Sequence, residues 1–287
     1  MGVDLSPRGF GRILDAAFDL YRANFRSIVI ASAAVLFPAA LLVSVTQVFY
    51  TRGLLQVIPG VFAGDIPFTE LDRVQIWSVL SNAVAPVFFI AQLYAGSAIL
   101  SAAPAMLAGQ RPGPWAILRG GWARFGWLII VSLAVSVLTG ISAIPLLFPA
   151  LFVWARLSVA RVVTIIEAAP LDRALARSWS LTGTNTWRTI GFAIALALIT
   201  IALETAVTAP SLIRQVVASV GDPEAIFAPL SAGWKTFEGA LSAVAVALVF
   251  PFAQLAWFFY YLDLRARREG MDLLVSAGEL SARKAGR

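Results

Sequence analysis

The sequence predicts an all-α fold, a polytopic membrane helix bundle of six transmembrane helices with both termini in the cytoplasm. The first observation is composition: 59% of the 287 residues are hydrophobic and 13% are charged, whereas globular domains average about 45–50% and 25%. The second is a series of six apolar runs, each near the roughly 20 residues that a helix needs to cross a bilayer. The third is an uneven distribution of arginine and lysine between the segments that join these runs.

The six apolar runs define the expected spans. They lie at about 27–49, 77–103, 126–142, 143–163, 189–209 and 240–261. Because these runs occupy most of the chain, we expect residues 1–287 to form a single integral membrane domain without a separate soluble domain. The boundary between the third and fourth spans is the hardest to place. The stretch from Trp127 to Ala155 is too short to cross twice, so the return span must continue past Arg156.

Eighteen of the 22 lysine and arginine residues fall in alternate connecting segments. These segments are 1–26, 108–125, about 154–188 and 263–287. The remaining connections carry only Arg52, Arg73, Arg214 and Lys235. Basic connections stay on the cytoplasmic side, which predicts a multi-pass protein of the cell membrane with both termini inside. Positive charge beside the spans favours the bilayer and its anionic lipid head groups as partners, and we expect no nucleic acid partner.

The segment before the first span has the pattern of an amphipathic helix. Ile13, Leu14, Ala17, Phe18 and Tyr21 recur at helical spacing, and the opposite face carries Arg12, Asp15, Asp19 and Arg22. This pattern predicts a helix within 1–26 that lies on the cytoplasmic membrane surface. Similar stretches precede the fifth span, at 171–178, and the third span, at 115–124. After the last span, residues 263–287 form a predicted basic tail.

These stretches also suggest an internal repeat. Phe18-x-Leu20-x3-Asn24 matches Trp179-x-Leu181-x3-Asn185, and both run into a span. The return helix of each expected hairpin carries proline, at Pro86, Pro145 with Pro149, and Pro251. The chain is therefore interpreted as a possible threefold helical-hairpin repeat, of the kind common in transporters. The alternative is that spans rich in alanine and leucine align through composition alone.

Three polar residues within the return spans form a candidate intramembrane cluster. Gln92, Arg156 and Gln254 lie at similar depth in their helices, and polar groups in hydrocarbon need a reason to be there. One interpretation is a binding site for an anionic or strongly polar group. The other is that Arg156 extends to the cytoplasmic interface and that the glutamines form hydrogen bonds between helices.

The candidate contacts at the cytoplasmic face are mainly arginines. They are Arg12, Arg22, Arg161, Glu167, Arg173, Arg177, Arg265, Arg267 and Arg268. Glu167 is expected to pair with Arg161 and Arg173 and to fix the surface helices, although exposed pairs of this kind contribute little stability individually. The same face is the expected place for a protein partner.

The chain offers little catalytic chemistry. It contains neither cysteine nor histidine, which excludes disulfides, thiol nucleophiles, imidazole catalysis and metal sites built on these ligands. No nucleophile elbow, phosphate-binding loop or HExxH motif is present. We therefore expect a protein that is not an enzyme and that has no cofactor or catalytic metal. A lipid-processing enzyme would need a cluster of carboxylates, and the acidic residues are dispersed.

The two ends and the middle of the chain resemble a known family. The segments are LSPRGFGRILDAAFDLYRANF (5–25), the stretch from Arg156 to Leu181, and YYLDLRARREGMD (260–272). They resemble bacterial membrane proteins described as the glycerophosphoryl diester phosphodiesterase membrane domain, with one extra residue between the last tyrosine and aspartate. The resemblance implies a six-span protein of the cytoplasmic membrane whose own activity is uncharacterised. The phosphodiesterase barrel of that family's fusions is absent, so its activity does not carry over.

Two functions fit these observations. The first is a membrane scaffold or accessory protein whose cytoplasmic helices bind a partner or anionic lipid. The alternative is a transporter or permease-like carrier with a polar site around Arg156. A cavity lined by Arg156 would favour the carrier, and tight packing around it would favour the scaffold.

Overall fold

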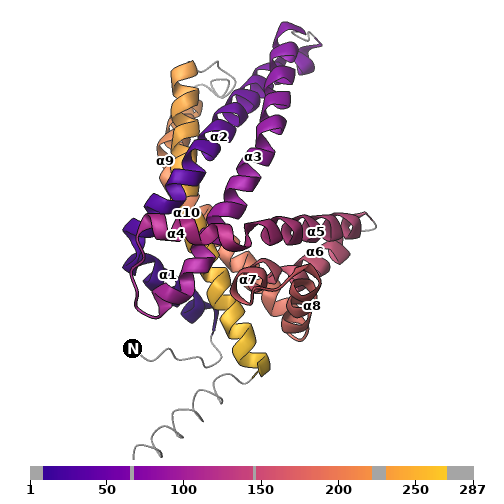
Figure 1. The fold of residues 1–287 in the computed structure, drawn as a ribbon. Helices are drawn as coiled ribbons and strands as arrows, with labels where there is room; N and C mark the ends of the chain where they lie inside the picture. Colours follow the sequence, from indigo (N-terminus) through magenta and orange to yellow (C-terminus); the bar gives the residue numbers. More distant parts are fainter. Residues whose placement is uncertain (1–8, 65–67, 145–146, 222–230, 270–287) are drawn as a thin grey trace, which may run out of the picture. The chain divides into compact units, whose positions relative to one another are not determined.

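The computed structural model describes residues 9–64, 68–144, 147–221 and 231–269. Within these ranges the chain forms helices and short connections and no strand, which confirms the all-α prediction (Figure 1). The helices are α1 (Phe10–Ala23), α2 (Phe25–Ala63), α3 (Phe68–Leu107), α4 (Pro114–Gly121), the 3-10 helix η1 (Trp122–Arg124), α5 (Phe125–Ala143), α6 (Leu147–Leu157), α7 (Ala160–Ile166), α8 (Leu171–Thr182), α9 (Thr186–Gly221) and α10 (Ala232–Glu269). Most of the predicted basic tail, with Arg283, Lys284 and Arg287, lies outside the described residues.

Six helical stretches of the described chain are long and apolar enough to cross a membrane. They are Phe25–Phe62, Leu71–Leu107, Pro114–Ala143, Phe148–Ile166, Thr186–Arg214 and Ala232–Glu269. Each overlaps one expected span, in the expected order. A multi-pass membrane protein is therefore supported, whereas the side that each terminus faces and the threefold repeat stay predictions. Pro86, Pro149 and Pro251 lie within α3, α6 and α10, and Pro145 lies outside the described residues.

Four helices are much longer than the apolar runs that predicted them. Helices α2, α3, α9 and α10 contain 39, 40, 36 and 38 residues. At 1.5 Å per residue, each is roughly 55–60 Å long, about twice the hydrocarbon thickness of a bilayer. The expected spans therefore mark only the apolar part of each helix, and the helices continue through polar residues such as Arg52 and Arg265.

The fourth expected span, 143–163, is not one helix. It begins at the last residue of α5, and most of it falls in α6 and α7, which are separated at Ser158 and Val159. The hydroxyl of Ser158 donates to the carbonyl oxygen of Ala155 at 2.9 Å, and Val159 has φ −93° and ψ 1°, outside the α-helical range. The apolar pattern continues across this break, which is why the sequence predicted a single helix.

The chain divides into two compact units. Unit 1 comprises Met1–Ile28, Gly96–Ala197 and Phe252–Arg287, and unit 2 comprises Val29–Ala95 and Leu198–Pro251. Each of the four long helices contributes one part to each unit. The division therefore does not follow the order of helices in the sequence.

Unit 1 is organised around aromatic side chains of α9 and α10. Phe192 and Tyr260 are stacked, with ring centroids 4.2 Å apart and planes 6° apart, and the Tyr260 hydroxyl lies 2.9 Å from Thr189 Oγ1. Helix α1 buries Ile13, Ala17 and Tyr21, whereas Phe18, which was expected on the same face, is exposed. That this helix lies on the membrane surface stays a prediction. Helices α5 and α6 pack together, as do α7 and α8 (Figure 1).

Unit 2 contains close contacts between the parts of the long helices that belong to it. Phe49 of α2 stacks on Trp77 of α3, with centroids 4.5 Å apart. Gly239 of α10 lies against Val45 of α2: a Cβ at residue 239 would approach the Val45 backbone nitrogen to 2.9 Å. Glycine at this position therefore allows the backbones of α2 and α10 to come together.

Candidate functional site

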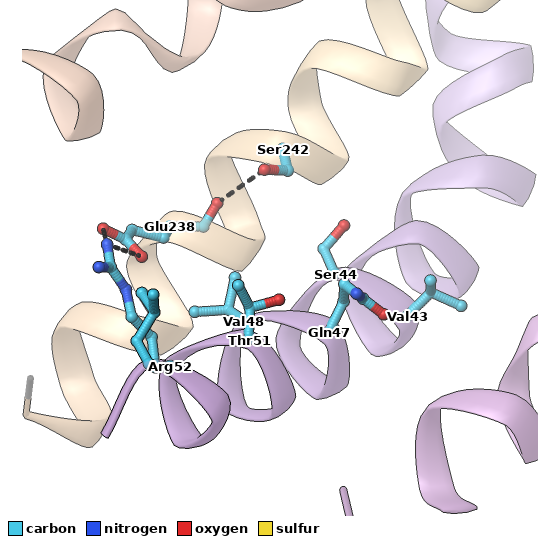
Figure 2. A pocket seen from close by; sticks show the side chains of 9 residues that line it. Val43, Ser44, Gln47, Val48, Thr51, Arg52, Glu238 and Ser242 are labelled. Carbon is cyan, nitrogen blue, oxygen red and sulfur yellow. Dashed lines mark hydrogen bonds and ion pairs between the residues drawn. The ribbon is translucent and has the colours of Figure 1, made fainter. Parts of the chain in front are cut away.

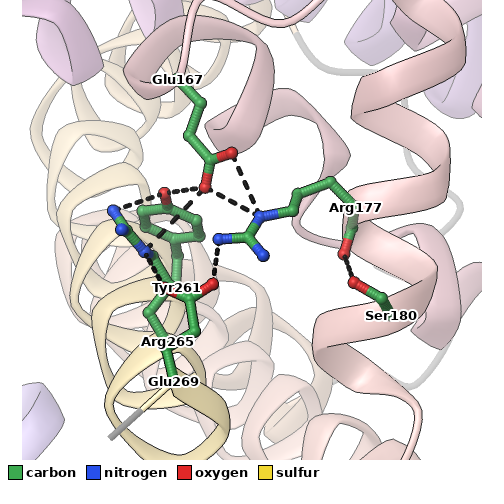
Figure 3. A network of polar contacts seen from close by, with 6 residues as sticks. All are labelled: Glu167, Arg177, Ser180, Tyr261, Arg265 and Glu269. Atoms are coloured by element: carbon green, nitrogen blue, oxygen red, sulfur yellow. Dashed lines mark hydrogen bonds and ion pairs between the residues drawn. The ribbon is translucent and has the colours of Figure 1, made fainter. Parts of the chain in front are cut away.

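A network of charged side chains joins α7, α8 and α10 within unit 1 (Figure 3). Arg177 Nε donates to both carboxylate oxygens of Glu167 at 3.1 Å, and Arg177 Nη2 donates to Glu269. Tyr261 donates its hydroxyl to Glu167 at 2.6 Å, and Arg265 Nε donates to Glu269 at 3.0 Å. We call these five residues the α7–α8–α10 network.

The positions of these residues follow from local structure. Tyr261, Arg265 and Glu269 are spaced by four residues, which places them on one face of α10. Glu167 follows the last residue of α7, and Ala168 after it has φ 54°. This left-handed conformation is uncommon for a residue with a Cβ, and it turns the chain from α7 towards α8. The network thus fixes the start of the α8 segment.

The α7–α8–α10 network is electrically balanced, since it contains two arginines and two glutamates. Each of these four side chains is between 24% and 30% exposed. Burial alone would lower the pKa of Arg177, but hydrogen bonds to Glu269 and Glu167 outweigh burial and raise it. The two glutamates therefore stabilise the charged form of the Arg177 guanidinium. The network connects α8 and α10 with the residue that follows α7.

A second ion-pair group lies on the same helix. Asp263, whose side chain is 1% exposed, accepts hydrogen bonds from Arg188 at 3.0 Å and Arg267 at 2.9 Å. The Arg188 guanidinium also lies 4.7 Å from the ring centroid of Phe10. This group connects α1, α9 and α10. Asp263 and Arg188 were not among the predicted contact residues, although the four-residue spacing of Asp263 and Arg267 is a recognisable helical pair.

Arg156 is held against α8. Its Nη1 donates to the Trp179 carbonyl at 3.2 Å, and its guanidinium lies 4.6 Å from the Trp179 centroid and 5.4 Å from that of Phe152. Its own carbonyl accepts hydrogen bonds from Ser178 at 2.8 Å and Thr182 at 3.0 Å. The end of α6 is therefore bonded to α8 through both backbone and side chain.

The structure leaves the predicted cluster of Gln92, Arg156 and Gln254 a prediction. Gln254 lies in unit 1 with Arg156, but no hydrogen bond joins the two among the described residues. Gln92 belongs to unit 2. The interactions of Arg156 come instead from Phe152 and from α8.

The other predicted face residues are distributed over unit 1. Glu167 forms an ion pair with Arg177, and its carboxylate lies 4.0 Å from the Arg265 guanidinium. The expected partners were Arg161 and Arg173. Arg161 is half-buried on α7. The exposed arginines of the predicted set are Arg12, Arg22, Arg173, Arg267 and Arg268. Of these exposed arginines, Arg267 also forms an ion pair, with Asp263. The other arginines of the two ion-pair groups are less exposed.

Unit 1 also contains exposed tryptophans. Every tryptophan of the described residues that is exposed lies in unit 1, at the positions Trp115, Trp122, Trp127, Trp179 and Trp187. They belong to α4, η1, α5, α8 and α9. Tryptophan concentrates at the boundary between hydrocarbon and water, and arginine concentrates on the cytoplasmic side of that boundary.

Unit 2 contains a pocket beside a buried ion pair, which was not among the predicted sites (Figure 2). Arg52 Nη2 lies 3.1 Å from Glu238, and their side chains are 9% and 8% exposed. Trp234 Nε1 also donates to Glu238, at 2.9 Å. The cavity beside this ion pair has a volume of about 350 Å³ and is also lined by Ser44, Gln47, Thr51 and Ser242. The sequence places Arg52 in a connection, because its charge interrupts the apolar run.

Within the described ranges no three acidic side chains gather closely enough to hold a metal ion. A scan of protein-family models found no match to the chain, and searches of curated proteins and of solved structures found none either. The resemblance of the chain to the phosphodiesterase membrane-domain family therefore stays a prediction.

Proposed function

We propose that this protein is an integral membrane scaffold or accessory protein, not an enzyme, whose unit 1 surface binds anionic lipid head groups at the cytoplasmic face. The observation that carries the proposal is that the exposed tryptophans of the described residues and the exposed arginines of the predicted set all belong to unit 1. Tryptophan favours the interface, and each basic residue near an anionic surface contributes about 1 kcal/mol of attraction.

The ion-pair groups support this assignment by a different route. The carboxylates of Glu167, Glu269 and Asp263 are engaged by arginines of neighbouring helices. They position α8 and the end of α10 and are not presented to an external ligand. Exposed residues of the same elements, such as Arg173 and Arg268, are then held at the surface.

The surroundings of Arg156 favour the scaffold over the carrier. Its guanidinium is stacked on Phe152 and Trp179, and its carbonyl is hydrogen-bonded to α8. A carrier site would need this group to line a water-filled path. The stacking supports a role in holding helices together, with the charged group at the membrane surface.

The test is lipid binding by the full chain in nanodiscs that contain phosphatidylcholine with or without phosphatidylglycerol. We expect phosphatidylglycerol to be enriched around the wild-type protein, as measured by lipid analysis of the purified discs. Replacing two exposed arginines, Arg22→Gln with Arg173→Gln, should weaken this enrichment roughly tenfold or more. The matched control, Arg73→Gln with Arg214→Gln, removes the same charge from the predicted outer side and should retain it. Equal enrichment in all three proteins would refute the proposal.

A further inference from the structure

Two guanidinium groups converge on Gly183, the residue that follows α8. A Cβ at this position would lie 2.7 Å from Arg156 Nη1 and 3.3 Å from Arg268 Nη1. Both groups therefore occupy the space beside one glycine, within unit 1. A side chain at residue 183 would displace at least one of them.

Among the described residues, no acidic side chain compensates the charge of these two arginines. Within the described part of the chain, neither Arg156 nor Arg268 forms an ion pair with a carboxylate, in contrast to Arg177 and Arg265. The C-terminal end of α8 supplies roughly half a negative charge through its carbonyl groups. Two guanidinium groups carry two positive charges, so more than one positive charge has no counter-charge among the described residues.

Arg156 also retains unused hydrogen-bond donors. A guanidinium has five N–H groups, and its recorded bond is the one from Nη1 to the Trp179 carbonyl. Its Nε is buried and has no partner in the structure. Burying a donor without an acceptor is unfavourable, which points to an anionic acceptor with several oxygens.

An apolar cavity begins at the same tryptophan. It has a volume of about 410 Å³ and is lined by Leu138 of α5, Val153 and Leu157 of α6, and Leu175, Ala176 and Trp179 of α8. Ligand pockets generally measure about 300–1,000 Å³. The Trp179 ring lines this cavity and also lies under the Arg156 guanidinium. A cationic site and an apolar cavity thus meet at one side chain.

We propose that Arg156 and Arg268 bind the phosphate of a membrane phospholipid and that one of its acyl chains occupies the cavity between α5, α6 and α8. Guanidinium groups bind phosphate oxygens through paired hydrogen bonds, and the cavity offers apolar contacts to methylene groups. The proposal rests on the proposed function in one respect, since it requires unit 1 to lie at a lipid interface. It differs because it requires one phospholipid molecule bound at a defined site, and not only a general enrichment of anionic lipid around the protein.

The experiment measures binding of three soluble probes to the full chain in detergent: short-chain phosphatidylglycerol, the diacylglycerol with the same chains, and inorganic phosphate. Native mass spectrometry counts the bound molecules. We expect one phospholipid to bind, and diacylglycerol and phosphate to bind at least about tenfold more weakly, because each lacks half of the contacts. Phosphate that binds as tightly as the phospholipid would overturn the lipid assignment.

Two variants test the two halves of the site. Arg268→Gln changes an exposed residue and should weaken phospholipid binding about tenfold. Ala176→Trp fills the cavity and should weaken phospholipid binding while leaving phosphate binding unchanged. Arg22→Gln is the matched control and should bind one phospholipid normally, even though it contributes to the general enrichment. Unchanged binding in either site variant would overturn the inference, whereas loss of enrichment alone would bear on the proposed function.

Discussion

Arg52 and Glu238 are opposite charges removed from water inside unit 2, with their side chains 9% and 8% exposed. Removing one partner leaves the other buried without compensation, which generally costs about 3–5 kcal/mol. We expect Arg52→Met to lower the free energy of unfolding by about this amount. The double variant Arg52→Met with Glu238→Leu should recover most of it, because apolar pairs can replace buried ion pairs.

Thermal unfolding of the detergent-solubilised protein, followed by tryptophan fluorescence, measures this difference. The exposed Asp72 provides a control, and Asp72→Asn should change the stability by less than about 0.5 kcal/mol. A double variant as unstable as the single variant would show that the two charges do not compensate each other.

Glu167 is the shared acceptor of the α7–α8–α10 network. Glu167→Ala removes the acceptor of the Arg177 guanidinium and the Tyr261 hydroxyl. Hydrogen bonds to charged groups contribute about 1.5–3 kcal/mol when buried, and partial exposure reduces this contribution. We therefore expect a loss of about 1–2 kcal/mol in the same unfolding assay. Asp172→Ala, which changes an exposed acidic residue of α8, should have little effect. Similar losses of stability in both variants would show that the hydrogen bonds of Glu167 do not stabilise the α7–α8–α10 network.

The partners of Glu167 show what local sequence patterns can and cannot predict at this scale. The sequence indicated that Glu167 takes part in an ion pair, because arginines surround it. It suggested Arg161 and Arg173, which are near in sequence. The actual partners include Arg265, which α10 brings from almost a hundred residues away. Local charge spacing carries no information about such a contact, and a tertiary structure is needed to find it.

At the scale of elements, glycine decides how closely α3 and α4 approach. A Cβ at Gly121 would lie 3.0 Å from Ala98 Cβ and 3.1 Å from the Ala98 backbone, and the Gly121 carbonyl accepts a 2.7 Å hydrogen bond from Ser97. Gly121→Leu should therefore force the helices apart and cost about 1–3 kcal/mol.

Gly126 provides the matched control for this prediction. It is also helical, but nothing lies within 4 Å of the position of its Cβ. Gly126→Ala should leave stability unchanged or raise it by up to about 1 kcal/mol. Thermal unfolding of both variants checks the pair. A loss of stability in Gly126→Ala equal to that in Gly121→Leu would show that the close contact with Ala98 does not determine the effect.

The element boundaries were only partly predictable. The expected bounds of the third span, 126–142, nearly coincide with those of α5, because the apolar run and the helix end at almost the same residue. The break between α6 and α7 was missed, since Ser158 and Val159 leave the apolar pattern intact. What holds the end of α6 is a pair of hydroxyls on α8, Ser178 and Thr182. A side-chain interaction between distant helices of this kind leaves no periodic signal in the sequence.

For the whole molecule, the number of helical stretches long and apolar enough to cross a membrane was predictable among the described residues, and the division into units was not. Bilayer thickness sets a minimum apolar length, and each of the six stretches satisfies it. Bilayer thickness does not limit how far a helix continues outside the hydrocarbon, so the expected spans were shorter than α2 and α10. The long helices each contribute to both units, and hydropathy does not report where along a helix its neighbours change.

The orientation of the whole molecule can be tested with single cysteines, because the natural chain contains none and any labelling reports the introduced residue. Gln110 and Asp72 are both exposed, and the arginine distribution places them on opposite sides of the membrane. Asp72→Cys should react with a membrane-impermeant maleimide in intact cells, and Gln110→Cys should react only after permeabilisation. The unsubstituted protein supplies the background. Reaction of Gln110→Cys in intact cells would place the exposed arginines and tryptophans outside, and an inner-leaflet lipid could then not reach Arg156 and Arg268.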